Sequence, residues 1–124
     1  MAKKILIVDD EPNIVVPLEF LMQQNRYETR VAENGEDALE LISSWRPDLV
    51  LLDIMLPGMD GYEVCRKIRE NPDVKGTRIV FLSAMAHSVD IAKGMELAAD
   101  EYIIKPFAVS DVVDRVRELL EKAE

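Results

Sequence analysis

VLLDIMLPGMDG, from Val50 to Gly61, is the stretch that decides how the chain folds. Its apolar run ends at a single carboxylate, Asp53, which is flanked by Leu52 and Ile54. A charged group at the end of a buried strand costs free energy unless another group pairs with it or uses it. The meaning of the stretch therefore depends on what the rest of the chain places beside Asp53.

The composition indicates one compact, acidic domain. The chain has 124 residues, 48% of them hydrophobic, and no change of composition or repeat marks a second domain. Fifteen basic and 24 acidic residues give a formal charge of -9, which argues against direct nucleic-acid binding. The single cysteine, Cys65, excludes an internal disulfide. No early apolar run is long enough for a signal peptide or a membrane span, so we expect a cytoplasmic protein that does not bind membranes.

Short apolar runs alternate with segments of helical periodicity along the chain. Five runs are predicted strands, and three of these are continuously apolar, as strands covered on both faces should be. The five are residues 5–8, 27–32, 49–52, 79–82 and 102–104. Asn34 and Asp60 precede helical segments, and Ser110 and Asp111 are available to cap the last one. Five βα units of this size predict a doubly wound α/β fold with a five-stranded parallel sheet.

Polar side chains follow the predicted strands at the edge where ligands bind in such sheets. Asp9 and Asp10 follow the first strand, Asp53 the third, Ser83 the fourth and Lys105 the fifth. These groups predict a site for a hard divalent cation and an anion, because oxygen ligands suit Mg2+ and a lysine can pair with a tetrahedral oxyanion. At about 4 Å and an effective dielectric near 20, each carboxylate pair repels by roughly 4 kcal/mol. The cluster therefore needs its cation.

Four motifs in this order make the sequence resemble one known family. They are VDDE at Val8 to Glu11, DIMLPGMDG at Asp53 to Gly61, LSA at Leu82 to Ala84, and YIIKPF at Tyr102 to Phe107. Over residues 4–120 the sequence resembles a receiver domain of bacterial two-component response regulators, of the chemotaxis-regulator type. The resemblance implies a flavodoxin-like (βα)5 fold with strand order 2-1-3-4-5. It also implies that residues 1–124 form a single receiver domain.

The resemblance implies a phosphoacceptor and a metal site. Asp53 resembles the carboxylate that takes a phosphoryl group from a phosphohistidine on a sensor histidine kinase or a phosphotransfer protein. Asp10, Asp53 and the main-chain carbonyl of Met55 resemble the ligands of Mg2+, for which Mn2+ is an alternative. Asp9 resembles the residue that acts on the ion through a bound water.

Other positions resemble groups that bind the phosphate and respond to it. Lys105 resembles the lysine that contacts one phosphoryl oxygen, and Ser83 with the Ala84 amide resembles the pair that binds another. Tyr102 resembles the aromatic switch that turns inward when Ser83 moves toward the phosphate. Pro106 resembles the family's usually cis proline. Phosphorylation would favour a state with Ser83 and Lys105 drawn inward.

The implied function is phosphorelay signalling. The chain would catalyse its own Mg-dependent phosphorylation without being an enzyme that acts on other molecules. The surface of its fourth helix, fifth strand and fifth helix would then signal to a downstream effector or a fused output domain. Met55 and Met85 border the expected path of the attacking water, and thioethers orient water poorly, so we expect slow dephosphorylation.

The resemblance to the winged-helix branch of the family also suggests a weak, phosphorylation-promoted homodimer. In that branch, active receivers pair through an apolar patch ringed by opposite charges. The acidic residues expected on this surface would face arginines of a second copy, with two apolar residues between them. The residues are Glu96, Asp100 and Glu101, then Arg115 and Arg117, then Met95 and Val112.

Alternatives from other classes stay open on the sequence alone. An enzyme of the haloacid-dehalogenase type also forms an aspartyl phosphate, but it requires a DxD motif that Asp9-Asp10-Glu11 lacks. A receiver fold that only binds partners is disfavoured, because every polar residue of the expected site is present. Asp9 and Asp10 could also simply cap the helix that follows them.

Four residues need separate interpretations. Pro17 lies inside a helical segment and removes a backbone hydrogen bond, so the first helix is either bent or begins late. Gly94 lies within the segment with the least clear apolar stripe, which suits an element that shifts between states. Cys65 falls at core spacing with other apolar residues, and we interpret it as a small buried side chain. His87 has no companion ligand and is expected to face solvent.

Overall fold

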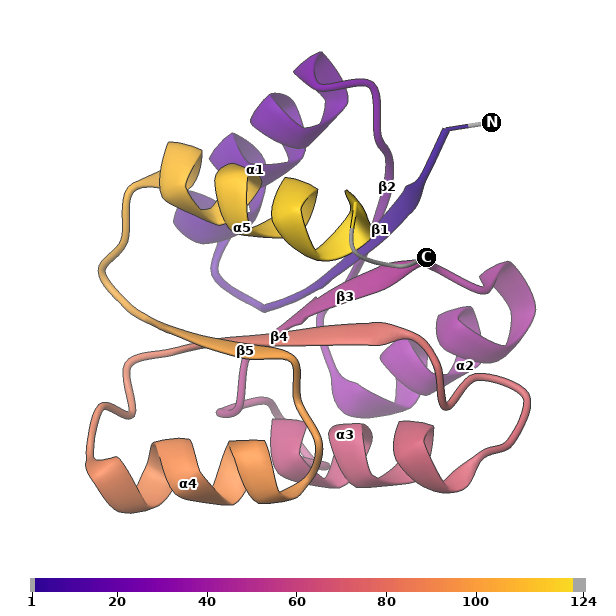
Figure 1. The fold of residues 1–124 in the computed structure, drawn as a ribbon, viewed down its shortest axis with the longest axis vertical. Helices are drawn as coiled ribbons and strands as arrows, with labels where there is room; N and C mark the ends of the chain where they lie inside the picture. The colour runs from indigo at the N-terminus through magenta and orange to yellow at the C-terminus, as the bar shows by residue number, and fades with distance from the viewer. Residues whose placement is uncertain (1, 122–124) are drawn as a thin grey trace.

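The computed structural model describes residues 2–121, in which strands and helices alternate (Figure 1). The strands match the predicted runs to within one residue at either end. The elements are β1 (Lys4–Val8), α1 (Pro12–Gln24), β2 (Glu28–Ala32), α2 (Gly35–Trp45), β3 (Leu49–Leu52), α3 (Gly61–Glu70), β4 (Arg78–Ser83), α4 (Ser88–Glu96), β5 (Glu101–Ile104) and α5 (Val109–Glu121).

The strands form one parallel sheet in the order β2-β1-β3-β4-β5. Val8 lies opposite both Ala32 and Leu52, and Ser83 lies opposite Ile104. The carboxyl ends of the strands therefore finish in register at one edge. The predicted doubly wound fold and its strand order are confirmed.

A layer of helices covers each face of the sheet (Figure 1), and alternate strand residues belong to the cores on opposite faces. In β1, Ile5 and Ile7 belong to the core that α1 and α5 cover, whereas Leu6 and Val8 belong to the core that α2 and α3 cover. All four residues of β3 are fully buried. Both faces of the sheet are thus covered, which explains the continuously apolar strands.

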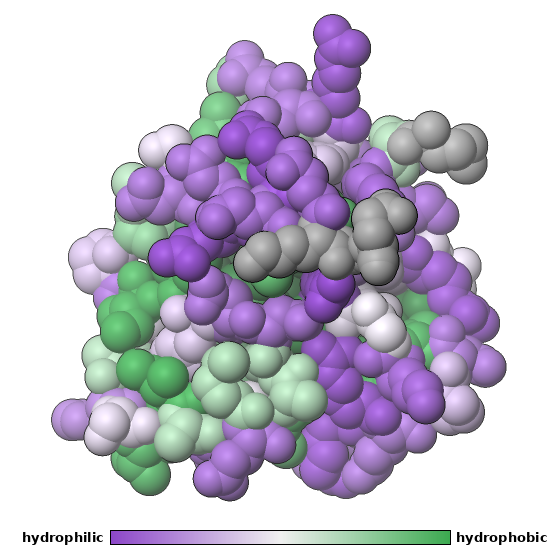
Figure 2. Space-filling model, in the orientation of Figure 1, coloured by the Kyte–Doolittle hydropathy of each residue, from purple (hydrophilic) through white to green (hydrophobic). Residues whose placement is uncertain are grey.

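The outer surface differs between the two layers. Figure 2 shows mainly hydrophilic residues over the side formed by α1 and α5, and hydrophobic residues gathered near β5 and α4. Among the exposed large apolar side chains are Val89 and Met95 on α4 and Ile104 at the end of β5.

Two of the predicted helix caps are present in the structure, and a third is not. Asn34 and Asp60 are N-caps, and each side chain accepts a hydrogen bond from the backbone N–H three residues later, at 2.8 and 3.0 Å. The last helix begins at Val109, the first apolar residue of its periodic segment. Ser110 and Asp111 therefore lie within its first turn and not at its cap.

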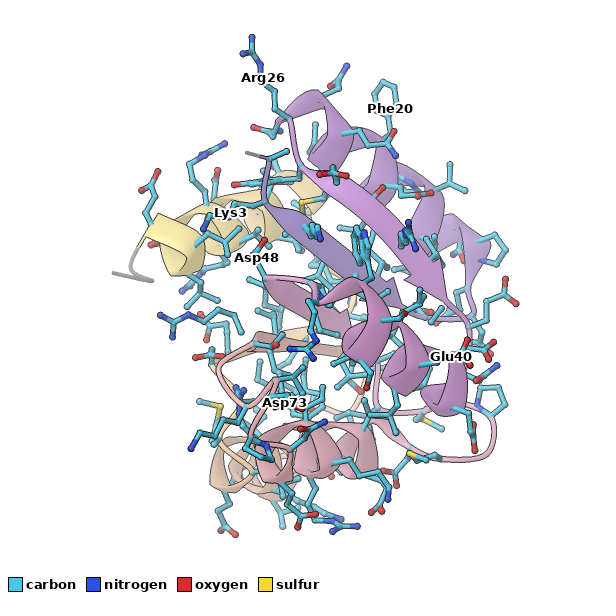
Figure 3. All side chains as sticks on the ribbon, turned by 90° about the vertical axis from the view of Figure 1, so that its right-hand side faces the viewer. Lys3, Phe20, Arg26, Glu40, Asp48 and Asp73 are labelled. Atoms are coloured by element: carbon cyan, nitrogen blue, oxygen red, sulfur yellow. The ribbon has the colours of Figure 1, made fainter. Side chains whose placement is uncertain are left out.

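The first helix runs from Pro12 through Pro17, so the alternative of a late start is wrong. Pro17 has no N–H to donate to the backbone carbonyl four residues earlier. Because Pro17 is exposed, water can bind that carbonyl instead. Leu18 and Met22 are fully buried in the core shared with α5 and stabilise the turns after the proline. Phe20 points away from the molecule on the outer side of the helix (Figure 3). The N-cap is Glu11 with no side-chain hydrogen bond, so neither preceding aspartate caps this helix.

Two further sequence interpretations are settled by burial. Cys65 is fully buried, its thiol donates to the Leu97 carbonyl at 3.5 Å, and burial raises its pKa to about 11. It is a core side chain, as predicted. His87 is exposed at the start of α4, where its backbone N–H donates to Asp90 Oδ2 at 3.2 Å.

Within residues 2–121, every helix is too short or too polar to cross a bilayer.

A close backbone approach fixes the start of α3 beside the end of β3. The Gly61 N–H donates to the Ile54 carbonyl at 2.8 Å. A Cβ atom on Gly61 would lie 2.2 Å from the Asp53 carbonyl oxygen and 2.8 Å from the Ile54 Cα. Backbone atoms cannot move aside as a flexible side chain can. Only glycine therefore fits at this position.

We expect Gly61→Ala to lower the free energy of unfolding by about 3 kcal/mol, because the added methyl group overlaps backbone atoms. Gly76→Ala is the matched control, since a Cβ atom there meets nothing within 4 Å, and its effect should stay within about 0.5 kcal/mol. Urea unfolding at neutral pH measures both. Equal destabilisation by the two variants would contradict the close approach at Gly61.

Candidate functional site

Strand pairing carries the backbone of three polar residues to the same edge of the sheet. The N–H groups of Asp9, Asp53 and Lys105 donate to carbonyls of neighbouring strands at 3.1, 2.9 and 2.8 Å. Each bond continues the pairing of a strand by one residue. The sheet thus places these three residues together at the edge that the sequence predicts.

Three carboxylates gather at this edge. Asp9, Asp10 and Asp53 each offer an oxygen, and these atoms lie within 4.8 Å of one another. Asp9 and Asp53 are 1% and 5% exposed, whereas Asp10 is exposed. Backbone N–H groups orient the buried pair, since Glu11 N donates to Asp9 Oδ1 at 2.9 Å and Ile54 N donates to Asp53 Oδ1 at 2.8 Å.

The ammonium group of Lys105 binds two of these carboxylates and a third one nearby. Lys105 Nζ donates to Asp9 Oδ2 at 2.9 Å, to Glu11 Oε1 at 3.0 Å and to Asp53 Oδ2 at 3.3 Å. Sequence reasoning assigned no role to Glu11. The available signal was its place directly after Asp10 in the VDDE motif.

Burial and neighbouring charges both shift the pKa values of Asp53 and Lys105. Burial raises the pKa of Asp53, the Lys105 ammonium counteracts this, and the neighbouring Asp9 carboxylate adds to it. Burial alone would lower the pKa of Lys105, but its hydrogen bonds to Asp9 and Glu11 and the nearby charges of Asp53 and Asp9 together raise this pKa. Lys105 is therefore charged at neutral pH and neutralises the buried acids.

The β4–α4 loop places the remaining predicted residues. Ser83 is buried, and its Oγ accepts a hydrogen bond from Met85 N at 3.1 Å. Ala84 is exposed. Tyr102 Oη donates to the Met85 carbonyl at 2.5 Å, and its ring lies 5.9 Å from that of Phe81. Tyr102 is thus turned toward this loop, and its role as the aromatic switch stays a prediction.

The donor set fits a hard cation. Carboxylate oxygens are the ligands that Mg2+ prefers, and exposed Asp10 leaves one side of the cluster accessible. Met55 lies in the loop after β3 with its side chain pointing outward, 68% exposed, and its carbonyl stays a predicted ligand. The Lys105–Pro106 peptide bond is cis, as the resemblance implies.

An apolar hollow of about 540 Å3 is lined by the residues that directly follow Asp53 in sequence and by residues of α3, α4 and the β4–α4 loop. Tyr62 forms one wall, with Lys93 Nζ 4.4 Å above its ring and its hydroxyl donating to the Asp90 carbonyl at 3.0 Å. Burial raises the pKa of Tyr62 to about 12, so the hydroxyl stays protonated as a donor. Sequence reasoning gave Tyr62 no role beyond the core. The hollow is lined by Ile54, Met55, Leu56, Asp60, Tyr62, Met85 and Lys93.

Comparisons with known proteins agree with this arrangement. A family model described as the response regulator receiver domain matches residues 5–117. A solved response regulator from Chloroflexus aurantiacus J-10-fl is 35% identical with a TM-score of 0.92, and the match covers 98% of this chain and all of that one. The BeF3-activated N-terminal receiver domain of Klebsiella pneumoniae RstA is 32% identical with a TM-score of 0.85, covering 93% and 96%.

A third similar structure is longer than this chain. DrrB, an OmpR/PhoB homolog from Thermotoga maritima, is 34% identical with a TM-score of 0.89, and the match covers all of this chain and 55% of DrrB. The fold and the site define a phosphoacceptor signalling module of the α/β class. The chain belongs to the response regulator receiver domain family. Membership excludes the haloacid-dehalogenase alternative.

Removing the ammonium should make the site depend on a cation. Without Mg2+, we expect Lys105→Met to lower the free energy of unfolding by about 3 kcal/mol, because two buried carboxylates lose their partner. Adding millimolar Mg2+ should raise the thermal midpoint of Lys105→Met more than that of the wild type. Lys67→Met, which removes an exposed ion pair 3.8 Å long, is the control. Identical Mg2+ shifts in the wild type and Lys105→Met would contradict the role given to Lys105.

Proposed function

We propose that Asp53 of this receiver domain accepts a phosphoryl group from a phosphohistidine of a sensor histidine kinase or a phosphotransfer protein, in a Mg-dependent reaction. One observation carries the proposal. A nearly buried carboxylate stands at a rigid strand end, with two further carboxylates within 4.8 Å and an ammonium at 3.3 Å. The reducing conditions of the cytoplasm, the proposed location, suit the unpaired Cys65.

The chain's own groups position the reaction. An oxygen of Asp53 attacks phosphorus, the phosphorus–oxygen bond forms, and the phosphorus–nitrogen bond of the donor breaks with its electron pair leaving on the imidazole. Ile54 N–H holds one Asp53 oxygen, which restrains the carboxylate. The Lys105 ammonium neutralises charge on a phosphoryl oxygen. Bound at the three carboxylates, Mg2+ would supply further charge neutralisation.

Phosphorylation changes the balance of charge that holds Lys105. A phosphoryl group adds negative charge and strong acceptors at Asp53. The ammonium then has a better partner than Asp9 or Glu11, and the Ser83 hydroxyl can leave its bond with Met85 N to bind the phosphate. Because Met85 also accepts from Tyr102, movement of this loop reaches β5 and the start of α4.

The proposed signalling surface is formed by α4, β5 and α5, where Figure 2 shows hydrophobic residues gathered near β5 and α4. Its exposed apolar members are Val89, Met95 and Ile104. Val112 was expected here, but it is fully buried and cannot contact a partner, because it packs in the core beneath α5. A downstream effector or a fused output domain would bind this surface.

Four residues expected at a dimer interface have ion-pair partners within the chain. Asp100 binds Arg69 at 3.1 Å and Arg78 at 3.2 Å. Arg117 binds Asp114 at 3.2 Å. Arg115 binds Glu101 at 2.7 Å, so an interface must replace that ion pair. We keep a weak homodimer as a proposal for the phosphorylated state only.

Sedimentation checks the homodimer. We expect beryllofluoride-treated protein to dimerise weakly at high concentration, and Met95→Glu to abolish dimerisation by placing a charge in the apolar surface. Val16→Glu, on the exposed side of α1 and away from this surface, is the control. A treated sample that stays monomeric would refute the proposal.

The phosphorylation site itself is tested by labelling. Asp53→Asn should abolish labelling by acetyl phosphate with Mg2+, because the amide cannot act as the nucleophile. Asp10→Asn should weaken Mg2+ binding and slow labelling without moving the label. Peptide mass spectrometry locates the phosphate. Phosphate found on the Asp53→Asn protein would show that another residue is the acceptor.

The lifetime of the phosphate depends on the water that attacks it. Met55 and Met85 both line the hollow beside Asp53, and a thioether is a weak acceptor with no donor. We expect slow loss after removal of the donor, and loss faster by a factor of order 10² in the variant that combines Met55→Asn with Met85→Glu. Unchanged decay in this variant would show that the methionines do not shield the phosphate.

A further inference from the structure

Met55 is the most exposed of the five methionines that the structure describes. Its side chain is 68% exposed, compared with 44% for Met95, while Met22 is fully buried and Met59 and Met85 are partly buried. Exposed apolar residues are common on protein surfaces, so exposure alone assigns no role. The position of Met55 is the informative feature.

Met55 shares one hollow with the two loops that hold the phosphorylation site. Ile54, which lines the hollow, donates its N–H to Asp53 Oδ1, and Met85, on the opposite loop, donates its N–H to Ser83 Oγ. The exposed residues of the hollow are Met55, Asp60 and Lys93. Of these, Met55 is the nearest to Asp53 in sequence, so a polar group on its side chain would lie close to water that approaches Asp53 through the hollow.

We propose that Met55 is a site of reversible oxidation that shortens the lifetime of the Asp53 acyl phosphate. The inference rests on the proposed function, because it requires phosphate on Asp53. The oxidant is a peroxide. One oxygen atom is transferred to the thioether: the sulfur–oxygen bond forms, the peroxide oxygen–oxygen bond breaks, sulfur loses two electrons, and hydrogen peroxide is reduced to water.

The product changes the chemistry of the hollow. A thioether accepts hydrogen bonds weakly, whereas a sulfoxide is polar. Its oxygen can accept a hydrogen bond from a water molecule and hold it beside the phosphoryl group. If this hydrogen bond is stronger in the transition state for phosphate loss than in the ground state, it accelerates the loss by about fivefold. Peroxide thus shortens the signal without altering Asp53.

The other methionines provide the contrast. Met22 is sealed in the core, and Met85 is partly buried within the hollow. Met95 is exposed on α4 but does not line the hollow. It should be oxidised by peroxide without affecting the phosphate. Met59 lies in the same loop as Met55 but does not line the hollow, which makes Met59→Leu the matched control for Met55→Leu.

The experiment compares phosphate loss before and after oxidation of the same protein. Wild type, Met55→Leu and Met59→Leu are treated with hydrogen peroxide, and the peroxide is then removed. Each protein is labelled with acetyl phosphate and Mg2+, and phosphate loss is followed after removal of the donor. Peptide mass spectrometry measures sulfoxide at each methionine. We expect an oxidised-to-reduced rate ratio of about five in wild type and Met59→Leu and about one in Met55→Leu. Methionine sulfoxide reductase should return the wild-type ratio to one.

Three results would overturn the inference. They are a ratio of one in wild type with Met55 oxidised, an unchanged fivefold ratio in Met55→Leu, and oxidation of Met95 while Met55 stays reduced. Circular dichroism of each oxidised sample shows whether faster loss comes from unfolding, which would also overturn it. Failure of the proposed function is distinct, because untreated wild type would then take no label on Asp53.

Discussion

The ammonium of Lys105 holds together a site that would otherwise repel itself. It binds Asp9, Glu11 and Asp53, which lie 96, 94 and 52 residues away in sequence. Carboxylates about 4 Å apart repel by roughly 4 kcal/mol per pair at an effective dielectric near 20, and the ammonium offsets this repulsion. The interaction that stabilises the unphosphorylated site is therefore the one that a phosphoryl group must rearrange.

The two ends of α4 are held differently, which directs that rearrangement. After its C-terminal end, Arg69 donates to the Ala98 carbonyl at 2.9 Å and binds Asp100 at 3.1 Å, so the turn into β5 is anchored to α3. At its N-terminal end, the Tyr62 hydroxyl donates to the Asp90 carbonyl at 3.0 Å. A change in the β4–α4 loop therefore acts on the less firmly held end.

Sequence periodicity predicted the fold and the gathering of the polar residues because both depend on the order of strands and on where each strand ends. It could not predict contacts that depend on how side chains meet across the fold. Glu11 reaches Lys105 only because of the direction in which its side chain leaves the start of α1. Val112 is buried because of how α5 is rotated on the sheet, and Asp100 is paired because α3 supplies an arginine. The pairing of Asp100 leaves no signal in local spacing. The burial of Val112 does leave one, because Val112 stands at helical spacing with Val109 and Val116.

The site divides the gain and the loss of phosphate between different side chains. In the proposed function, the Lys105 ammonium, which Asp9 binds, assists the arrival of a phosphoryl group at Asp53. In the same proposal, apolar groups that include Met55 and Met85 affect how water approaches the phosphate. Because the methionine side chains supply none of the charge, changes there can alter the lifetime of the phosphate while the carboxylate cluster stays intact. The duration of a signal can thus vary independently of the chemistry that starts it.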